Sequence, residues 1–185
     1  RIVYDVAGIL PEVTTTEHNM RNITLALLNK NLIFNYATEY MLKHDKIAPV
    51  KDFQITESEY SEFMNFIKGK DYSYKTETEL VMEELKKEAE NEKYFANIKA
   101  EYDKLGAKIN ADKKDDLIKN KEEIKQYIEE EIASRYYFQM GRIGQSVKAD
   151  KDIKTAVEVL TNEARLKSVL TTIEKPTKPF NPRKR

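Results

Sequence analysis

Residues 77–142 are the part of the sequence that most restricts its fold, because they contain no proline and consist largely of Glu, Lys and helix-forming apolar residues. Apolar side chains recur there every three or four positions, which is the spacing of one face of an α-helix. The apolar stripes are narrow, so each helix can bury only one side. We therefore predict two long helices, at about residues 77–105 and 112–142, joined by the sequence GAKIN and packed as an antiparallel hairpin of roughly 45 Å. The GAKIN segment would be the tip, where amides exchange fastest.

Two further helix starts are indicated by local motifs. Thr56 is followed three residues later by Glu59, and Thr76 by Glu79, so each pair can form a reciprocal capping box. Gly69 is placed to end the helix that Thr56 begins.

The stretch that follows Asn22 carries a wide apolar stripe. It predicts a largely buried helix from Asn22, which would cap it, to about His44. Further along, the sequence SRYYFQM changes from Glu and Lys to aromatic residues. We expect Tyr136, Phe138 and Met140 to be buried against the Asn22 helix, in which case truncating Phe138 to Ala would cost about 3–5 kcal/mol.

Composition favours a mainly α fold, a helical bundle with a long hairpin. Hydrophobic residues make up 40% and charged residues 35% of the chain, with only 5 Gly and 5 Pro, a balance typical of long solvated helices. Asp150 is the expected N-cap of a last helix. Beyond it, residues 173–185 read as a basic, Pro-containing tail without the capacity to pack.

Charge and cysteine content exclude several classes of function. The 32 basic and 32 acidic residues cancel, so no attraction of the whole molecule to nucleic acid or anionic lipid is indicated. The absence of cysteine excludes disulfides, thiolate metal sites and a Cys nucleophile. No apolar run approaches the ~20 residues that a membrane span needs.

Ionisable side chains offer few candidates for chemistry. His18 and His44 have no second histidine or carboxylate at ligand spacing, so we interpret them as surface histidines. Asp115 and Asp116 are consecutive, as are Glu129–Glu131, and a helix points consecutive side chains in different directions. These carboxylates therefore favour a solvated face over an acid/base or metal site.

One Ser–Lys combination lies beside a glycine. Ser146 is two residues before Lys148 and two after Gly144, but the second glycine of a nucleophile elbow is missing. The five glycines are too scattered for a phosphate-binding loop. We predict no catalytic residue, no cofactor-binding residue and no metal ligand in this chain.

The opening sequence RIVYDVAGILPEV resembles the segment that closes the protease domain in carboxy-terminal processing (tail-specific) peptidases, which usually reads G-R-x-V-Y-D-G-G-G-I-x-P-D-V. The matching positions are Arg1, Val3, Tyr4, Asp5, Gly8, Ile9, Pro11 and Val13. Val6 and Ala7 replace glycines and Glu12 replaces an aspartate, so a Gly-rich turn is not implied. The sequences KNLIFNYATEY, SEFMNFIKGKDYSYKTETE and IASRYYFQMGRIGQSVKAD look like the helical C-terminal extension of such proteases in Bacteroides-like bacteria.

The resemblance implies three regions. Residues 1–16 would be the last strand and turn of an upstream protease domain, residues 17–172 a helical C-terminal domain, and residues 173–185 a disordered basic tail. The parent would be an exported Ser/Lys serine endopeptidase, with its catalytic motifs upstream and a PDZ domain that selects C-terminal tails of substrates.

The chain would then be a non-catalytic scaffolding or interaction domain. Its implied partners are the upstream protease domain and, in addition, a second subunit, an adaptor or a protein substrate. Its implied location is extracytoplasmic, either periplasmic or attached to a membrane through the parent chain. The alternative is a free-standing, coiled-coil-like helical adaptor with no protease parent.

We expect the isolated chain to have no peptidase activity, because no serine in it has a positioned base and oxyanion donors. Incubation with a peptide that has a free C-terminal tail, followed by mass spectrometry, measures this. Reproducible cleavage that disappears in Ser146→Ala would contradict the prediction.

Overall fold

The computed structural model describes residues 11–16 and 19–171, and within these it contains α-helices and no β-strand. The helices are α1 (Asn22–Asn29), α2 (Leu32–Lys43), α3 (Glu57–Ile67), α4 (Glu77–Asn91), α5 (Phe95–Lys113), α6 (Asp116–Lys119), α7 (Lys121–Ala149), α8 (Lys151–Thr161) and α9 (Glu163–Thr171). The mainly α prediction is confirmed, whereas the strand expected near the N-terminus lies outside the described residues. Contacts divide the chain into two units: residues 19–148, and a second unit that includes residues 11–16 and 149–171.

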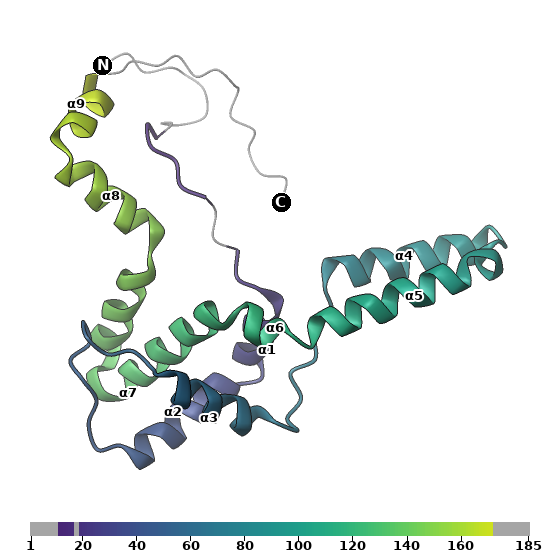
Figure 1. The fold of residues 1–185 in the computed structure, drawn as a ribbon, viewed down its shortest axis with the longest axis horizontal. Helices are drawn as coiled ribbons and strands as arrows, with labels where there is room; N and C mark the ends of the chain where they lie inside the picture. Colours follow the sequence, from purple (N-terminus) through teal and green to yellow (C-terminus); the bar gives the residue numbers. More distant parts are fainter. Residues whose placement is uncertain (1–10, 17–18, 172–185) are drawn as a thin grey trace. The chain divides into compact units, whose positions relative to one another are not determined.

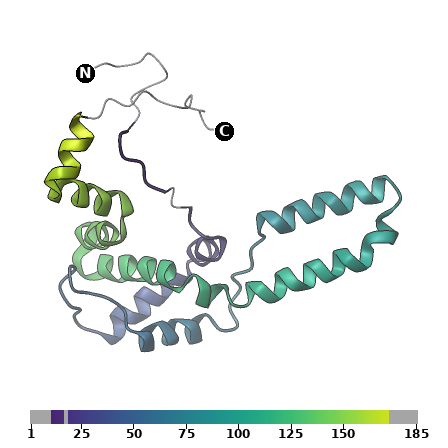
Figure 2. The ribbon, with the colours of Figure 1, turned by 45° about the horizontal axis from the view of Figure 1, so that its top comes forward.

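The core of the first unit forms where α1, α2 and α3 pack against the first half of α7 (Figures 1 and 2). Ile124, Ile128 and Ile132 of α7 recur every four residues and are completely buried. Phe53 and Ile55, from the loop between α2 and α3, complete the cluster. The other core residues are Ile23, Leu27, Leu32, Ile33, Tyr36, Ala37, Tyr40, Tyr60, Phe63 and Ile67.

The capping boxes are confirmed at both predicted positions. The Thr56 and Thr76 side chains accept the backbone N–H groups of Glu59 and Glu79, and each glutamate accepts the backbone N–H of its threonine in return. Gly69, just beyond α3, has φ +78, which glycine adopts at little cost at a helix end.

The predicted single helix from Asn22 to about His44 is wrong, because α1 and α2 are separate. Asn31 between them adopts the left-handed conformation, φ 54 and ψ 25, which asparagine tolerates better than most residues. Asn22 is not the cap either. Arg21 occupies the N-cap position without a side-chain bond, and the Asn22 amide instead donates to the Lys75 carbonyl at 3.4 Å.

A helical hairpin is present, but its predicted boundaries are wrong. The helices that pair are α4 and α5, joined at residues 92–94, where Lys93 has φ 64. The GAKIN segment is not the tip but continues α5. A Cβ on Gly106 would lie 3.7 Å from the Met82 methyl, an ordinary contact, so this glycine sits within a helix where α4 packs on α5. The predicted second arm, residues 112–142, belongs mostly to α7 and lies in the core.

The aromatic block at the end of α7 is divided between core and solvent. Helical geometry is interrupted at Phe138, which has φ 55 and ψ −146. Tyr136 is half-buried and donates to the His44 carbonyl at 2.5 Å. Phe138 and Met140 are instead 77% and 74% exposed, so the prediction that they are buried is wrong. The kink turns them outward.

After the kink, α7 returns to the loop between α2 and α3. A Cβ on Gly141 would lie 2.4 Å from the Ala133 carbonyl oxygen, and one on Gly144 would lie 2.5 Å from Val50. The buried Gln145 side chain donates to the carbonyls of Val50 and Phe53, each at 3.1 Å. Gly144 therefore permits the close approach to the loop that these hydrogen bonds require, while Gly141 permits close packing against Ala133 within α7.

The second unit contains α8 and α9. The Asp150 carboxylate caps α8 by accepting the Ile153 backbone N–H at 2.9 Å, as predicted. The expected single last helix is interrupted at Asn162, whose side chain accepts the Arg165 backbone N–H at 3.0 Å and so starts α9. In the same unit, the Thr15 hydroxyl donates to the Asp152 carboxylate in the first turn of α8.

Replacing Phe138 by Gly should give a more stable protein than replacing it by Ala. Both substitutions remove the exposed ring, but only glycine adopts φ 55 with ψ −146 without strain. We expect the free energy of unfolding of Phe138→Gly to exceed that of Phe138→Ala by ~1 kcal/mol, as measured by urea denaturation. A more stable Phe138→Ala would indicate a regular helix through this position.

Candidate functional site

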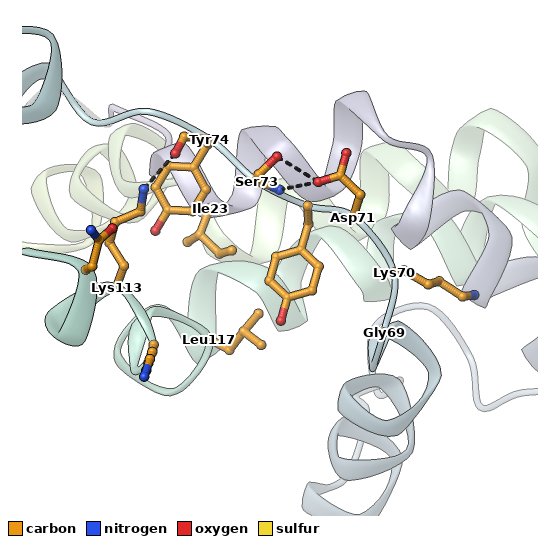
Figure 3. Close-up of a pocket in the computed structure, with 11 residues that line it drawn as sticks. Ile23, Gly69, Lys70, Asp71, Ser73, Tyr74, Lys113 and Leu117 are labelled. Carbon is orange, nitrogen blue, oxygen red and sulfur yellow. Dashed lines mark hydrogen bonds between the residues drawn. The ribbon is translucent and has the colours of Figure 1, made fainter. Parts of the chain in front are cut away.

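An open hollow of about 450 Å³ lies where the hairpin joins the core (Figure 3). Its walls come from α1, from the loop that connects α3 to α4, from the end of α5 and from α6. It is lined by Ile23, Gly69, Lys70, Asp71, Tyr72, Ser73, Tyr74, Asn110, Lys113, Lys114 and Leu117. Its walls therefore include the two chain segments through which the hairpin leaves and re-enters the core.

Lys113 joins both ends of the hairpin. Its ammonium contacts the Glu79 carboxylate at 2.9 Å, donates to the Tyr74 carbonyl at 2.6 Å, and lies 4.4 Å from the centre of the Tyr74 ring. Glu79 also completes the capping box at the start of α4. Burial opposes ionisation of Glu79, but the Thr76 backbone N–H and the Lys113 ammonium outweigh it and lower the pKa of Glu79 below its ordinary value. The carboxylate therefore stays charged and holds the end of α5 against the start of α4.

The connecting loop is fixed on both sides of the hollow. The Tyr74 hydroxyl donates to the Asp116 carboxylate of α6, and burial together with this carboxylate raises the pKa of Tyr74. Asp71 pairs with Lys30 at 2.7 Å and accepts the Ser73 hydroxyl and backbone N–H. The Lys30 ammonium and the Ser73 groups lower the pKa of Asp71. These contacts tie the loop to the core and to α6.

Several polar groups of the hollow are thus engaged with other residues of the chain. Lys113, Tyr74 and Asp71 have partners within the chain, and the Lys70 ammonium lies 3.0 Å from the centre of the Phe66 ring. These contacts position the helical hairpin on the core.

The sequence identified Glu79 through its capping box but missed Lys113 as its partner. A lysine in the last turn of a helix is a signal for stabilisation of the helix C-terminus. Because the hairpin turn was placed at GAKIN, the end of α5 was not expected beside the start of α4.

The structure separates Ser146 from Lys148. The Ser146 hydroxyl donates to the Ile143 carbonyl at 3.0 Å. The Lys148 ammonium donates to the carbonyls of Val50 and Phe53 at 3.0 and 2.9 Å. Lys148 therefore supports the loop between α2 and α3 in this structure, and neither contact joins the hydroxyl to the amine.

Of the two histidines, the structure describes His44. His44 lies at the end of α2, stacked on the Tyr40 ring with the centroids 4.0 Å apart, and its ring nitrogen lies 2.9 Å from the Tyr40 carbonyl. His18 is outside the described residues.

Consecutive carboxylates diverge as the helical geometry predicts. Glu129 accepts the Ile55 backbone N–H at 2.9 Å, Glu130 accepts the Gln126 amide at 2.9 Å, and Glu131 pairs with Arg135 at 2.8 Å. Across the part of the chain that the structure describes, no group of three or more His, Asp or Glu side chains is arranged to hold a metal ion. None of the helices described is long and apolar enough to cross a membrane.

Comparison with known protein families identifies a relationship for most of the chain. The model of a family described as "Probable PDZ-protease, C-terminal helical domain" matches residues 23–160. The match begins in α1 and ends in α8, so it includes the core, the hairpin and the hollow between them. No curated protein and no solved structure matches the chain.

Lys113→Met should loosen the hairpin without unfolding the core. The substitution keeps an unbranched apolar stem but leaves Glu79 and the Tyr74 carbonyl without their charged donor. We expect a loss of about 1–3 kcal/mol in the protection of α4 and α5 amides, measured by native-state hydrogen exchange, with α7 amides near Ile128 unchanged.

Lys114→Met is the matched control, because Lys114 also lines the hollow, while its side-chain ammonium, unlike that of Lys113, has no hydrogen bond or ion pair with any other residue that the structure describes. Equal effects of the two substitutions would show that net charge, and not the Lys113 contacts, holds the hairpin.

Proposed function

Because this chain belongs to the family of C-terminal helical domains of probable PDZ-proteases, we propose that it is a non-catalytic scaffold whose α4–α5 hairpin contacts a protein partner of the protease. The partner is a protein substrate, an adaptor or a second subunit. The peptide-bond chemistry is carried out elsewhere in the parent protein.

The observation that carries this proposal is the exposure of the hairpin. In α4 only Met82 and Ala89 are buried, and α5 has no buried residue. Exposed apolar side chains are distributed along both helices: Leu80, Val81, Leu85 and Leu105. An anchored helical pair with free outer faces fits the recognition of another protein through helix surfaces.

The length of the hairpin supports a role in contacting a partner at a distance from the core. With 15 residues in α4 and 19 in α5, the helices are about 22 and 28 Å long. In Figures 1 and 2, α4 and α5 extend away from α1, α2, α3 and the first half of α7. A protein bound along the hairpin would thus be held by a part of the molecule whose position is set through Lys113.

The resemblance of residues 1–13 to the segment that closes a protease domain supports a finer proposal for the parent. It is a serine endopeptidase with a Ser nucleophile and a Lys base upstream, a PDZ domain that selects C-terminal tails, and an extracytoplasmic location. A chain without cysteine suits an oxidising compartment. The alternative of a free-standing adaptor is disfavoured, since the family is described as a domain of a protease.

Shortening the hairpin in the full protease tests the scaffold role. Replacing residues 86–102 by a short turn retains Glu79, Met82, Gly106 and Lys113. If the arm holds protein substrates, cleavage of β-casein should slow about tenfold, which corresponds to ~1.4 kcal/mol of lost contact. Cleavage of a short peptide with the C-terminal sequence of β-casein should not change.

Two further measurements on the same variant test the other two kinds of partner. Loss of assembly in light scattering would indicate that the hairpin binds a second subunit. Loss of a co-purifying protein would indicate that it binds an adaptor. Val81→Ser with Leu85→Ser is the companion variant, and Glu84→Ser with Lys87→Ser is its control on exposed polar positions. If the shortened enzyme retains normal protein cleavage, assembly and co-purification, the scaffold proposal is wrong.

A further inference from the structure

The second unit contains an apolar stripe that no described residue covers. Ile153, Val157 and Leu160 follow one another at intervals of four and three residues on α8, and they are 38%, 53% and 66% exposed. This spacing places all three on one face of the helix. Val159, on another side of α8, is buried, and α9 packs against α8.

The remaining exposed surface of α8 is charged. Lys154 and Glu158 lie between the apolar positions in sequence and are exposed, as is Lys151 at the start of the helix. An apolar centre with charged residues beside it is the usual composition of a protein–protein contact.

The chain that enters the helical domain passes directly beside this helix. The Thr15 hydroxyl donates to the Asp152 carboxylate, so residue 15 lies at the first turn of α8. Thr15 is four positions after Pro11, and an extended chain of that length reaches at most about 14 Å. Residues 1–13 resemble the end of a protease domain. A protease domain that ends there must therefore lie within about one helix length of α8, since 11 residues of helix span about 16 Å.

We propose that the Ile153–Val157–Leu160 face of α8 docks on the protease domain of the same chain. This inference rests on the proposed function, because it requires a protease domain upstream of residue 11. Because the connection is short, the protease domain is present near α8 at a high effective concentration. A second copy or a separate protein would have to bind from solution. The contact joins the last part of the helical domain to the protease domain and so braces the domain at both ends of its chain.

Photo-crosslinking in the full protease tests the occupant. Benzoylphenylalanine placed at Val157 should form crosslinks within one chain, and mass spectrometry should map them to peptides of the protease domain. The same probe at Lys154, on the charged side of α8, should crosslink at least about fivefold less. Crosslinks at the size of a dimer, crosslinks to a co-purifying protein, or equal yields at 154 and 157 would overturn the proposal.

A smaller probe covers the case in which benzoylphenylalanine is too large for the contact. The sequence has no cysteine of its own, so Val157→Cys and Lys154→Cys are unique thiols in this region. In the intact protease, alkylation of Val157→Cys should be at least about tenfold slower than that of Lys154→Cys, and the two rates should become equal in urea. Equal rates in the native protein would overturn the docking of α8.

These outcomes are independent of the hairpin experiment. Rapid alkylation of Val157→Cys in a protease that still depends on its hairpin for protein substrates would reject the docking surface alone. An intact parent sequence without a protease domain would reject the proposed function itself.

Discussion

Three isoleucines of α7 hold the first unit together. Ile124, Ile128 and Ile132 are completely buried, and each contributes roughly 1.5–3 kcal/mol through removal of its side chain from water. The helices around them have only 8, 12 and 11 residues, too few to be stable alone in water. α1, α2 and α3 therefore depend on α7 as their common surface, and the residues that contact α7 decide their orientation.

The hairpin depends on a different kind of interaction. It lacks a buried core of its own beyond Met82 and Ala89, so packing alone does not fix its direction. The Glu79–Lys113 pair is about four-fifths buried at its side chains and shares the Tyr74 carbonyl. Its geometry is favourable because one glutamate both caps α4 and binds α5. Apolar packing thus forms the body of the domain, and a small polar cluster positions the arm.

Features set by a few neighbouring residues were predictable from the sequence. The capping boxes at Thr56 and Thr76 and the Asp150 cap follow from hydrogen bonds over three residues. The hairpin turn was misplaced for the opposite reason. Gly106 lies within α5 despite the low helix propensity of glycine, while the real turn uses Lys93 at φ 64, which carries no glycine signal.

For the same reason, the sequence predicted only one of the two partners in the polar cluster at the base of the hairpin. Glu79 is marked by its spacing from Thr76, but the Lys113 contact spans 34 residues and depends on where the hairpin turns. Burial of the aromatic block was also misjudged, because a kink at Phe138 changes which side chains face the core. Hydrophobicity gives the amount of surface to be buried, but not the point at which a long helix bends.

The exposed apolar residues outside the core form a pattern that a self-sufficient domain would not need. Scattered apolar side chains on a surface are ordinary, but the α8 stripe is continuous on one face, and Phe138 is held outward in a backbone conformation that costs about 1–3 kcal/mol. Neither contributes to the cluster around α7. Coverage of these side chains by another protein surface would offset this cost, in agreement with a family described as the C-terminal helical domain of a probable PDZ-protease.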